Sequence, residues 1–419
     1  MENTLIKNEY DYDVIVIGGG AAGMMAAGRA GFLGKKVLIL EKNRQLGEKL
    51  KITGGGRCNV TNAEEDMRVF LKNYKNADKF LHSPFSQFSQ KDTFEFFEKR
   101  GLPLVVQARK RAFPHTEKAI DVYRVMEKYI KDSGVLVKTN SPVNKIIKDK
   151  NKIIGLKVGS NTYTAQSYIL ATGGMSHPET GSTGDGFKWL SDLGHTVKAP
   201  TPTIVPLSVK EVWVKSMPGV SLSFMKITFY LDGVKKFSKT GKILFTHFGL
   251  SGPLILNSAG EVHDLLYEGV VTAKIDAYPD TNKGDLEKKI IKVFDENKNK
   301  ILKNVMDELA PQGTAGAILS LLKDLDGNIK VHSITKENRK ALVNLLKGLP
   351  LTISGLMGFD RAVVADGGVD LNEVDMKTMK SKVLENLYIT GDLLHINRPS
   401  GGFSLQICWT SGFIAGGNA

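Results

Sequence analysis

A glycine-rich motif near the N-terminus has the residue types and spacing that bind a pyrophosphate. Residues Gly18 to Gly23, Gly-Gly-Gly-Ala-Ala-Gly, satisfy the pattern G-x-G-x-x-G. Gly18 permits a tight turn, Gly20 lets the backbone approach the phosphates, and Gly23 allows a helix to pack closely on a strand. The first N–H groups of that helix then face the phosphates. The motif predicts a site for the ADP half of a dinucleotide.

The residues around this motif strengthen the prediction. Residues 13–17 and 36–40 are short apolar runs typical of buried parallel strands, and residues 21–33 are rich in the helix former Ala. This order is one strand–helix–strand unit. Glu41 ends the second strand, 23 residues after Gly18, where an acid can accept hydrogen bonds from ribose hydroxyls.

Three later segments favour FAD over NAD as the dinucleotide. Ala171-Thr172-Gly173-Gly174 follows a buried strand at 168–172, and Thr390-Gly391-Asp392 follows another at 387–390. Ser400-Gly401-Gly402-Phe403 precedes a final helix, whose N-terminus could face the electron-rich edge of a flavin. The chain contains no second G-x-G-x-x-G that opens a helix. NAD(P)H would therefore dock briefly against the flavin, or another donor would reduce it.

Composition excludes several other classes of protein. The 419 residues include only two cysteines, Cys58 and Cys408, and no Cys-x-x-Cys, which argues against disulfide scaffolds, thiolate metal sites and redox cysteine pairs. No His-x-x-x-His spacing occurs, so we expect no metal. No apolar run approaches the length of a membrane span, and Met1 to Tyr10 lacks the apolar core of a secretory signal. We expect a cytoplasmic protein that does not enter a membrane.

The pattern of elements predicts an α/β fold with a discontinuous flavin domain. Amphipathic helices are expected at 76–101 and 117–133, antiparallel strands within 203–277, and helices within 283–346. The expected division of the chain is a flavin domain at 1–193 and 358–419, an inserted β domain at 194–280 with a return strand at 347–357, and a helical subdomain at 281–346.

Four long motifs resemble the BaiN/RdsA-type NAD(P)/FAD-dependent oxidoreductases. They are Lys49 to Asn62 (KLKITGGGRCNVTN), Gly173 to Gly186, Leu244 to Pro253 (LFTHFGLSGP), and Gly391-Asp392 with Gly401 to Gln406. Two departures are Gly391-Asp392, where the family often has Gly-Glu, and Ile407-Cys408-Trp409, where it usually has a tryptophan-rich stretch. Neither changes the FAD assignment.

The resemblance implies a glutathione-reductase-like FAD domain with a Rossmann unit, a β-barrel-like insertion and a helical subdomain. It also implies that residues 47–62 wrap the cofactor. Together with the motifs, it gives the predicted flavin-binding residues: Gly18, Gly20, Ala21, Ala22, Gly23, Glu41, Lys42, Lys49, Thr53, Gly54, Gly55, Arg57, Cys58, Asn59, Val143, Ala171, Thr172, Gly173, Gly391, Asp392, Gly402, Phe403 and Gln406.

Members of this family resemble either bile-acid pathway reductases or enzymes that reduce a uridine of large-subunit ribosomal RNA to dihydrouridine. In both reactions a reduced flavin gives hydride to a carbonyl-conjugated C=C bond, and a general acid supplies the proton. The net charge of +13 favours a polyanionic partner, because a steroid-like substrate requires no protein charge. Three basic patches occur: the residues Lys42, Arg44, Lys49, Lys51 and Arg57, the run Arg109-Lys110-Arg111, and the lysines of residues 283–304. Arg109-Lys110-Arg111 is the predicted RNA contact. Any one patch taken alone is more typical of a solvated face. A third possibility is a flavin-bearing RNA-binding protein without turnover.

Two residues are predicted to supply the proton. Cys58 lies in the segment expected to wrap the flavin, and a protonated thiol can donate at neutral pH. The alternative is a small buried residue packed under the cofactor, the commoner position of a free cysteine. His247, in the third motif, is the second candidate, and its alternative is a hydrogen-bonded structural histidine.

Overall fold

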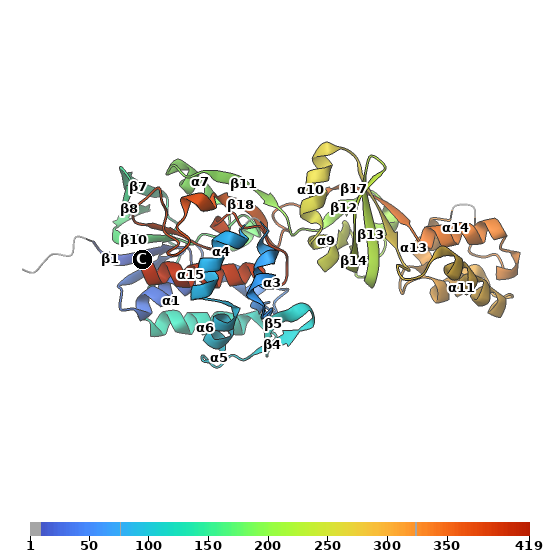
Figure 1. Cartoon of the computed structure of the whole chain (residues 1–419), viewed down its shortest axis with the longest axis horizontal. Helices are drawn as coiled ribbons and strands as arrows, with labels where there is room; N and C mark the ends of the chain where they lie inside the picture. Colours follow the sequence, from blue (N-terminus) through green and yellow to red (C-terminus); the bar gives the residue numbers. More distant parts are fainter. Residues whose placement is uncertain (1–9, 76, 323–324) are drawn as a thin grey trace, which may run out of the picture. The chain divides into compact units, whose positions relative to one another are not determined.

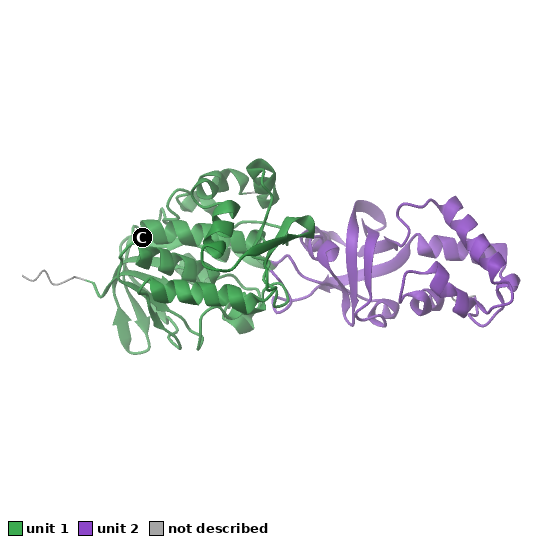
Figure 2. Ribbon diagram, turned by 90° about the horizontal axis from the view of Figure 1, so that it is seen from below, with its two compact units in different colours: residues 1–201, 364–419 green, residues 202–363 purple. Residues whose placement is uncertain are grey.

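The chain folds into two compact units in the computed structural model, which describes residues 10–75, 77–322 and 325–419. Unit 1 comprises the residues up to Thr201 together with Val364–Ala419, and unit 2 comprises Pro202–Val363 (Figure 2). The expected boundaries, 193/194 and 357/358, lie a few residues before these points. Residues 1–9, 76, 323 and 324, which fall within the expected segments, lie outside the described residues.

A five-stranded parallel sheet forms the centre of unit 1, in the order β19-β10-β1-β2-β6. Its strands are short and apolar, and Val14 to Ile17 are almost wholly buried, as expected when both faces of a parallel sheet are covered. The strands are β1 (Tyr12–Ile17), β2 (Val37–Leu40), β6 (Leu136–Lys138), β10 (Ala165–Leu170) and β19 (Leu387–Ile389).

Two helices from opposite ends of the chain pack together in this unit: α1 (Ala21–Phe32) and α15 (Phe403–Asn418) (Figure 1). Glycines on α15 make this packing close. A Cβ atom at Gly412 would lie 2.5 Å from the carbonyl oxygen of Ala22, and one at Gly416 would collide with the backbone of Ala26. The last helix is therefore fixed against the helix that follows the glycine motif.

Smaller elements complete unit 1. The expected helix at 76–101 is two helices, α4 (Asp78–Gln87) and α5 (Gln90–Glu98). The break has a local cause, because Ser89 and Asp92 form a capping box that starts α5. The remaining elements are α2 (Glu48–Ile52), α3 (Met67–Leu71), α6 (Ala119–Asp132) and α7 (Asp185–Asp192), the sheet of β3 (Thr61–Asn62), β5 (Arg111–Pro114) and β4 (Leu104–Gln107), the sheet of β7 (Lys145–Asp149), β8 (Lys152–Val158) and β9 (Asn161–Tyr163), and the pair β11 (Val197–Pro202) and β18 (Ala365–Val369).

Unit 2 contains a closed antiparallel barrel in the order β12-β15-β14-β13-β16-β17. Its interior is filled by alternate apolar side chains such as Ile227, Phe229 and Phe245. The strands are β12 (Leu207–Val209), β13 (Ser221–Leu231), β14 (Val234–Thr246), β15 (Gly249–Ser251), β16 (Val271–Asp276) and β17 (Leu349–Leu356). Between β16 and β17 the chain forms α11 (Lys283–Glu296), α12 (Leu302–Leu309), α13 (Ala315–Ser320) and α14 (Lys336–Leu346).

In the described parts of the chain, no helix has the length and apolar character needed to cross a membrane. The same parts contain no group of three or more His, Cys, Asp or Glu side chains placed to hold a metal ion.

Candidate flavin-binding site

The glycine motif forms a cradle at the start of α1. Gly18 has φ of 99°, and a Cβ atom there would lie 2.6 Å from the carbonyl oxygen of Ala171. A Cβ atom at Gly23 would collide with the carbonyl oxygen of Gly18, whereas nothing lies within 4 Å of one at Gly20. No side chain caps the N-terminus of α1, and its first turn has no acid. Gly18 and Gly23 therefore allow close packing that a side chain would prevent, and Gly20 leaves the open space that a pyrophosphate needs.

Glu41 lies directly against this cradle. Its side chain is buried, with Oε2 accepting from the Gly19 N–H at 2.7 Å and Oε1 from the Asn43 N–H at 2.8 Å. The carboxylate thus joins the glycine loop to the end of β2, and the remaining lone pairs can accept ribose hydroxyls. The hydrogen bond from the Gly19 N–H joins the predicted sugar contact to the predicted phosphate cradle, and the bond from the Asn43 N–H fixes the carboxylate at the end of β2.

The segment predicted to wrap the cofactor has an unusual backbone. Gly54, Gly55 and Gly56 have φ of 62°, 67° and 86°, and Cys58 has φ of 57°. Nothing lies within 4 Å of a Cβ atom at Gly55 or Gly56. Glycine alone adopts such a run without strain. The open space beside these residues fits a bound group close to the backbone.

The C-terminal motif closes on this segment. A Cβ atom at Gly402 would collide with the Thr61 backbone, and Asn62 Nδ2 donates to the Gly401 carbonyl oxygen at 3.2 Å. The Gln406 oxygen accepts from the Thr61 hydroxyl at 2.5 Å. Gln406 is fully buried and its amide nitrogen donates to Thr410. Its observed contacts thus fix the wrapping segment onto α15.

Lys49 and Arg398 place two cations near the predicted flavin contact Asp392. Lys49 Nζ donates to Ser176 Oγ at 3.0 Å, and no ion pair of this lysine occurs among the described residues. Burial lowers the pKa of Lys49, which the negative charge of Asp392 partly offsets. Arg398 is 6% exposed and pairs with Asp392. A partly buried ammonium group without a paired carboxylate fits an anionic ligand such as the FAD pyrophosphate.

Other predicted contacts have structural partners. Lys42 Nζ pairs with Asp185 at 2.8 Å, which ties the end of β2 to the Gly181–Gly186 segment. Val143 lies in the hydrophobic core.

The buried hydroxyl of Thr172 has no hydrogen-bond partner in the described structure. Thr172 follows the strand that borders Gly18. An unsatisfied hydroxyl beside the cradle is a further feature that FAD would complete.

The two predicted proton donors differ in accessibility. The Cys58 side chain is 0% exposed, and burial raises the pKa of its thiol. His247 is exposed in the turn after β14, where its ring lies edge-on to Phe248 with centroids 5.0 Å apart. Cys58 belongs to unit 1 and His247 to unit 2. The burial of Cys58 favours its structural alternative, a small residue packed under the cofactor. The His247 ring is open to solvent, and a general acid must in addition reach the atom that it protonates.

Arg109, Lys110 and Arg111 connect β4 to β5 and are named here the basic hairpin. Arg109 and Lys110 are exposed, with φ of 62° and 56°. Lys110 pairs with Glu64 at 2.7 Å. Partial burial lowers the pKa of Arg111, and the charges of Arg109 and Arg57 lower it further. Cationic side chains therefore gather beside the wrapping segment.

Two contacts of the site were not predicted from the sequence, that of Arg398 with Asp392 and that of Ser176 with Lys49. Arg398 lies in an irregular segment and belongs to no motif, although a single arginine shortly before the Gly401-Gly402 pair could have suggested an anion contact. Ser176 lies inside the Gly173–Gly186 motif, but its partner Lys49 is 127 residues away.

Comparison with known proteins places this geometry in a family. The model of the HI0933-like protein Rossmann domain matches residues 12–418. The chain belongs to the HI0933-like family. This membership confirms the resemblance, the FAD-dependent oxidoreductase class and the α/β fold with its Rossmann unit. NAD(P)H as the electron donor stays a prediction.

Relatives in this family have two kinds of substrate. A 3-dehydro-bile acid delta(4,6)-reductase of Clostridium scindens is 28% identical, over 96% of this chain and 97% of the relative. A ribosomal RNA dihydrouridine synthase of Haemophilus influenzae is 27% identical, over 95% of this chain and 96% of the relative. An Escherichia coli synthase with the same description is 26% identical, over 96% of both chains.

Solved structures share the fold at lower identity. A flavocytochrome c3 fumarate reductase superposes with a TM-score of 0.53 at 16% identity, over 97% of this chain and 78% of the other. A 3-ketosteroid delta1-dehydrogenase from Sterolibacterium denitrificans gives 0.51 at 14% identity, over 97% of this chain and 98% of the other.

Proposed function

We propose that this oxidoreductase reduces a uridine of large-subunit ribosomal RNA to dihydrouridine, with electrons from NAD(P)H. One observation carries the proposal: the basic hairpin is bonded directly to the segment predicted to wrap the flavin. Asn62 pairs with Arg111 across β3 and β5, and its side chain donates to the Arg109 carbonyl oxygen at 3.2 Å. Cationic side chains beside the flavin segment would bind the phosphates flanking a base turned out of its stack.

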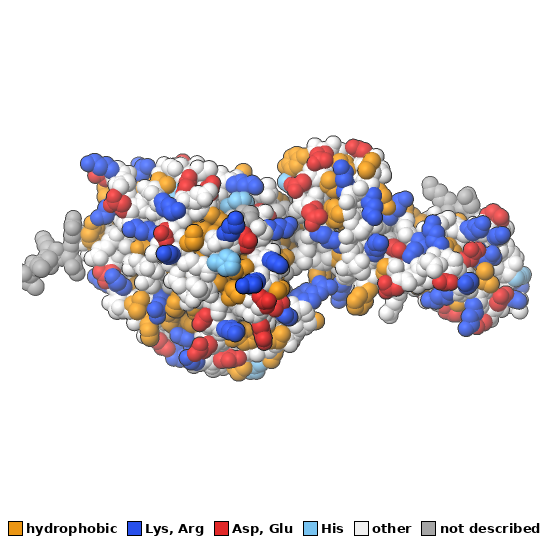
Figure 3. Space-filling view, viewed as in Figure 1, with side chains coloured by type: hydrophobic (Ala, Val, Ile, Leu, Met, Phe, Trp, Pro, Cys, Tyr) orange, Lys and Arg blue, Asp and Glu red, His pale blue; other side chains and the backbone are white. Residues whose placement is uncertain are grey.

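Ion pairing distinguishes the basic hairpin from the lysines of residues 283–304. Lys110 pairs with Glu64, but Arg109 and Arg111 form no ion pair among the described residues. On α11, Lys288 pairs with Asp285 at 3.1 Å and Lys292 with Glu296 at 4.0 Å. Figure 3 shows acidic side chains mixed with the basic ones on the visible face of this helical part. Local pairing lowers the attraction of such a face for phosphate. The lysines of α11 therefore fit a solvated surface.

The reaction requires a hydride, a proton and a bound base. When bound, FAD supplies the hydride to the β-carbon of the conjugated C=C bond. A protein group must then deliver a proton to the α-carbon. The exposed imidazole of His247 is our proposed donor, and Cys58 is the less accessible alternative. Cations of the basic hairpin position the substrate by its backbone phosphates.

Mapping of ribosomal RNA tests the proposal. A strain lacking the gene should lose dihydrouridine at one position of the large-subunit RNA, read by mass spectrometry of RNA fragments. The wild-type gene should restore it. A gene with Arg109, Lys110 and Arg111 changed to Gln should restore little, whereas Lys288→Gln, Lys292→Gln and Lys298→Gln together should restore it fully. Unchanged dihydrouridine in the deletion strain would overturn the proposal.

The bile-acid reductase among the relatives favours one alternative, reduction of a small enone. Its identity to this chain, 28%, is as high as that of the RNA-modifying relatives. Mixing the anaerobically reduced enzyme with a 3-keto-Δ4 steroid or with unmodified ribosomal RNA separates the two. Flavin reoxidation by the steroid alone would support the enone reductase, and reoxidation by RNA alone would support the first proposal. Titration of the oxidised enzyme with NADH and with NADPH would identify the donor.

A further inference from the structure

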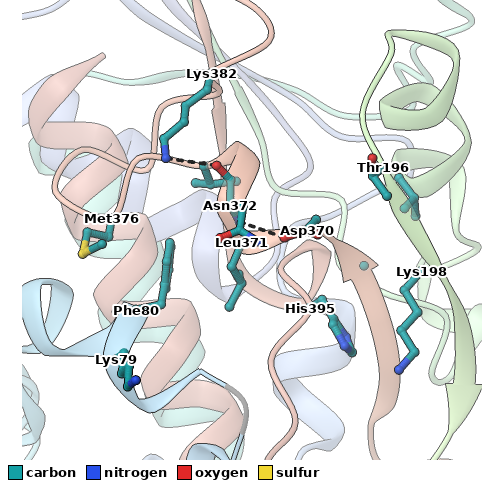
Figure 4. Close-up of a pocket in the computed structure, with 13 residues that line it drawn as sticks. Lys79, Phe80, Thr196, Lys198, Asp370, Leu371, Asn372, Met376, Lys382 and His395 are labelled. Carbon is teal, nitrogen blue, oxygen red and sulfur yellow. Dashed lines mark hydrogen bonds between the residues drawn. The ribbon is translucent and has the colours of Figure 1, made fainter.

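A cavity of about 500 Å³ opens in unit 1, and no residue of the glycine motif lines it (Figure 4). Its volume lies in the range of small-molecule sites. The wall is formed by the start of α4, the start of β11, the end of β18 and the chain that follows it, and the segment after Asp392. None of the predicted flavin-binding residues lines it. The cavity is therefore a second candidate site in the same unit.

The charged groups in the wall are mostly cationic. Lys79, Lys198 and Lys382 line the cavity together with a single acid, Asp370. Asp370 Oδ1 is engaged by the Asn372 N–H at 2.8 Å, and Lys382 Nζ donates to the Asn372 carbonyl oxygen at 3.0 Å. Lys382 keeps further N–H donors for a ligand, since an ammonium group has three. The arrangement favours an anion.

Lys198 and His395 lie at the same end of the cavity (Figure 4). The pKa of His395 is lowered chiefly by burial and next by the positive charge of Lys198, and Asp366 and Asp370 partly offset this. Figure 4 shows the side chains of Lys198 and His395 extending to the same end of the cavity. Because its pKa lies below 6.5, the His395 imidazole is neutral near pH 7, and the positive charge at this end of the cavity comes from Lys198. The opposite wall is apolar, with Phe80, Leu371 and Met376, and offers a surface to an organic body.

A buried hydrogen-bond network holds the wall in place. His195 Nδ1 lies 2.9 Å from Glu373 Oε2, and the same oxygen accepts from the Thr196 N–H at 2.9 Å. His195 Nε2 lies 2.9 Å from Ser381 Oγ. Thr196 lines the cavity, and Glu373 and Ser381 adjoin residues that do. Segments about 180 residues apart are thus joined into one wall, so the site is preorganised.

The Ser381–His195–Glu373 series also has the residue types of a hydrolase triad, but its geometry excludes that use. Ser381 Oγ accepts from the backbone N–H groups of Val383 at 3.0 Å and Leu384 at 2.9 Å. Its side chain is also buried. A hydroxyl oxygen occupied by two donors and shielded from solvent is a poor nucleophile. The network is structural.

We propose that this cavity binds an organic phosphate, whose phosphate contacts Lys198 and whose organic body lies on the apolar wall (Figure 4). The inference does not depend on the identity of the reduced substrate. Lysine binds phosphate as a compact charge through charge-assisted hydrogen bonds. A nucleotide matches both the cationic and the apolar side of the cavity.

Calorimetric titration of the FAD-loaded full chain with AMP tests the site, with NADP+ as a competing probe. The variant Lys198→Gln should weaken AMP binding by about tenfold or more, the effect of losing a charged hydrogen bond. Lys188→Gln, on the exposed face of α7, is the matched control and should bind AMP as the wild type does. FAD content and melting temperature of each variant verify folding.

The outcomes are separable. Loss of AMP binding in Lys198→Gln alone supports the site. Displacement of AMP by NADP+ would then assign the site to a pyridine nucleotide, and AMP binding without such displacement would assign it to another nucleotide. Wild-type enzyme that binds neither probe at millimolar concentration, or a Lys198→Gln variant with unchanged affinity, would overturn the proposal. Neither result bears on uridine reduction, which is measured on RNA.

Discussion

The guanidinium of Arg398 pairs with the carboxylate of Asp392, and the arginine is buried at the N-terminal end of α15. Two further contacts fix the arginine, to the Ile396 carbonyl oxygen at 2.5 Å and to Ser404 Oγ at 3.0 Å. Asp392 follows β19 and borders Gly174. The pair therefore sets the position of the acid predicted to contact the flavin.

Arg398→Met should lower both stability and FAD content. Removing one partner of a buried ion pair leaves an uncompensated charge and costs about 3–5 kcal/mol. Arg361→Met is the control, because its pair with Asp360 at 3.6 Å is exposed and should contribute at most about 1 kcal/mol. Denaturant unfolding and the ratio of flavin to protein absorbance measure the two effects. Equal losses of unfolding free energy and FAD content in both variants would show that the buried pair contributes no more than the exposed one.

Gly412→Ala should separate α15 from α1. The added methyl group would lie 2.5 Å from the Ala22 carbonyl oxygen, and Ala22 belongs to the glycine motif. Overpacking of this kind costs about 1–3 kcal/mol. We expect a lower melting temperature and weaker FAD retention. Gly417→Ala is the control, because its methyl group would meet only Arg29 Nε at 3.8 Å. It should keep the wild-type melting temperature and FAD content. A decrease as large as that of Gly412→Ala would refute the packing argument.

His247→Gln and Cys58→Ala distinguish the two proton donors. If His247 supplies the proton, its loss should reduce turnover by about 10²–10⁴-fold with FAD retained. Cys58→Ala should keep most turnover and lose some stability, because the thiol is wholly buried. Single-turnover oxidation of the reduced flavin by substrate measures the step directly. The reverse pattern would return the role to Cys58.

Lowering the pH should destabilise unit 1 through His195. Burial lowers the pKa of this imidazole in the folded chain, and Glu373 opposes the shift. The unfolded chain, with a pKa near 6.5, therefore binds more protons below that pH. The free energy of unfolding should fall between pH 6.5 and about 5, by at most about 1.4 kcal/mol per pH unit.

The carboxylate of Glu373 and the hydroxyl of Ser381 are the groups bonded to the His195 ring. The pKa of Glu373 is lowered from 4.5. Its contribution to the free energy of unfolding is therefore lost only below the window between pH 6.5 and about 5. Melting temperatures of wild type and His195→Gln across this window measure the effect. A slope that persists in His195→Gln would assign the pH dependence to another group.

Much of the site was predictable because its signals are local. Gly18, Gly20 and Gly23 have their roles within one turn of chain, and Glu41 follows at the end of the next strand, so spacing alone predicted their association. Helix boundaries were less predictable. The capping box of Ser89 divided one expected helix into two, and β14 extends to Thr246 beyond the expected end at Phe237 because its polar residues face outward on the barrel.

The sequence by itself determined the glycine loop at the start of α1 and the flavoprotein class, since both depend on short motifs whose geometry is set by neighbouring residues. Only the tertiary structure decided how distant residues meet. The contact of Thr61 with Gln406 joins positions 345 residues apart, and the contact of His195 with Ser381 joins positions 186 apart. The burial of Cys58 likewise depends on the packing of the wrapping segment in the core. Such contacts follow from the packing of whole elements, which no local spacing encodes.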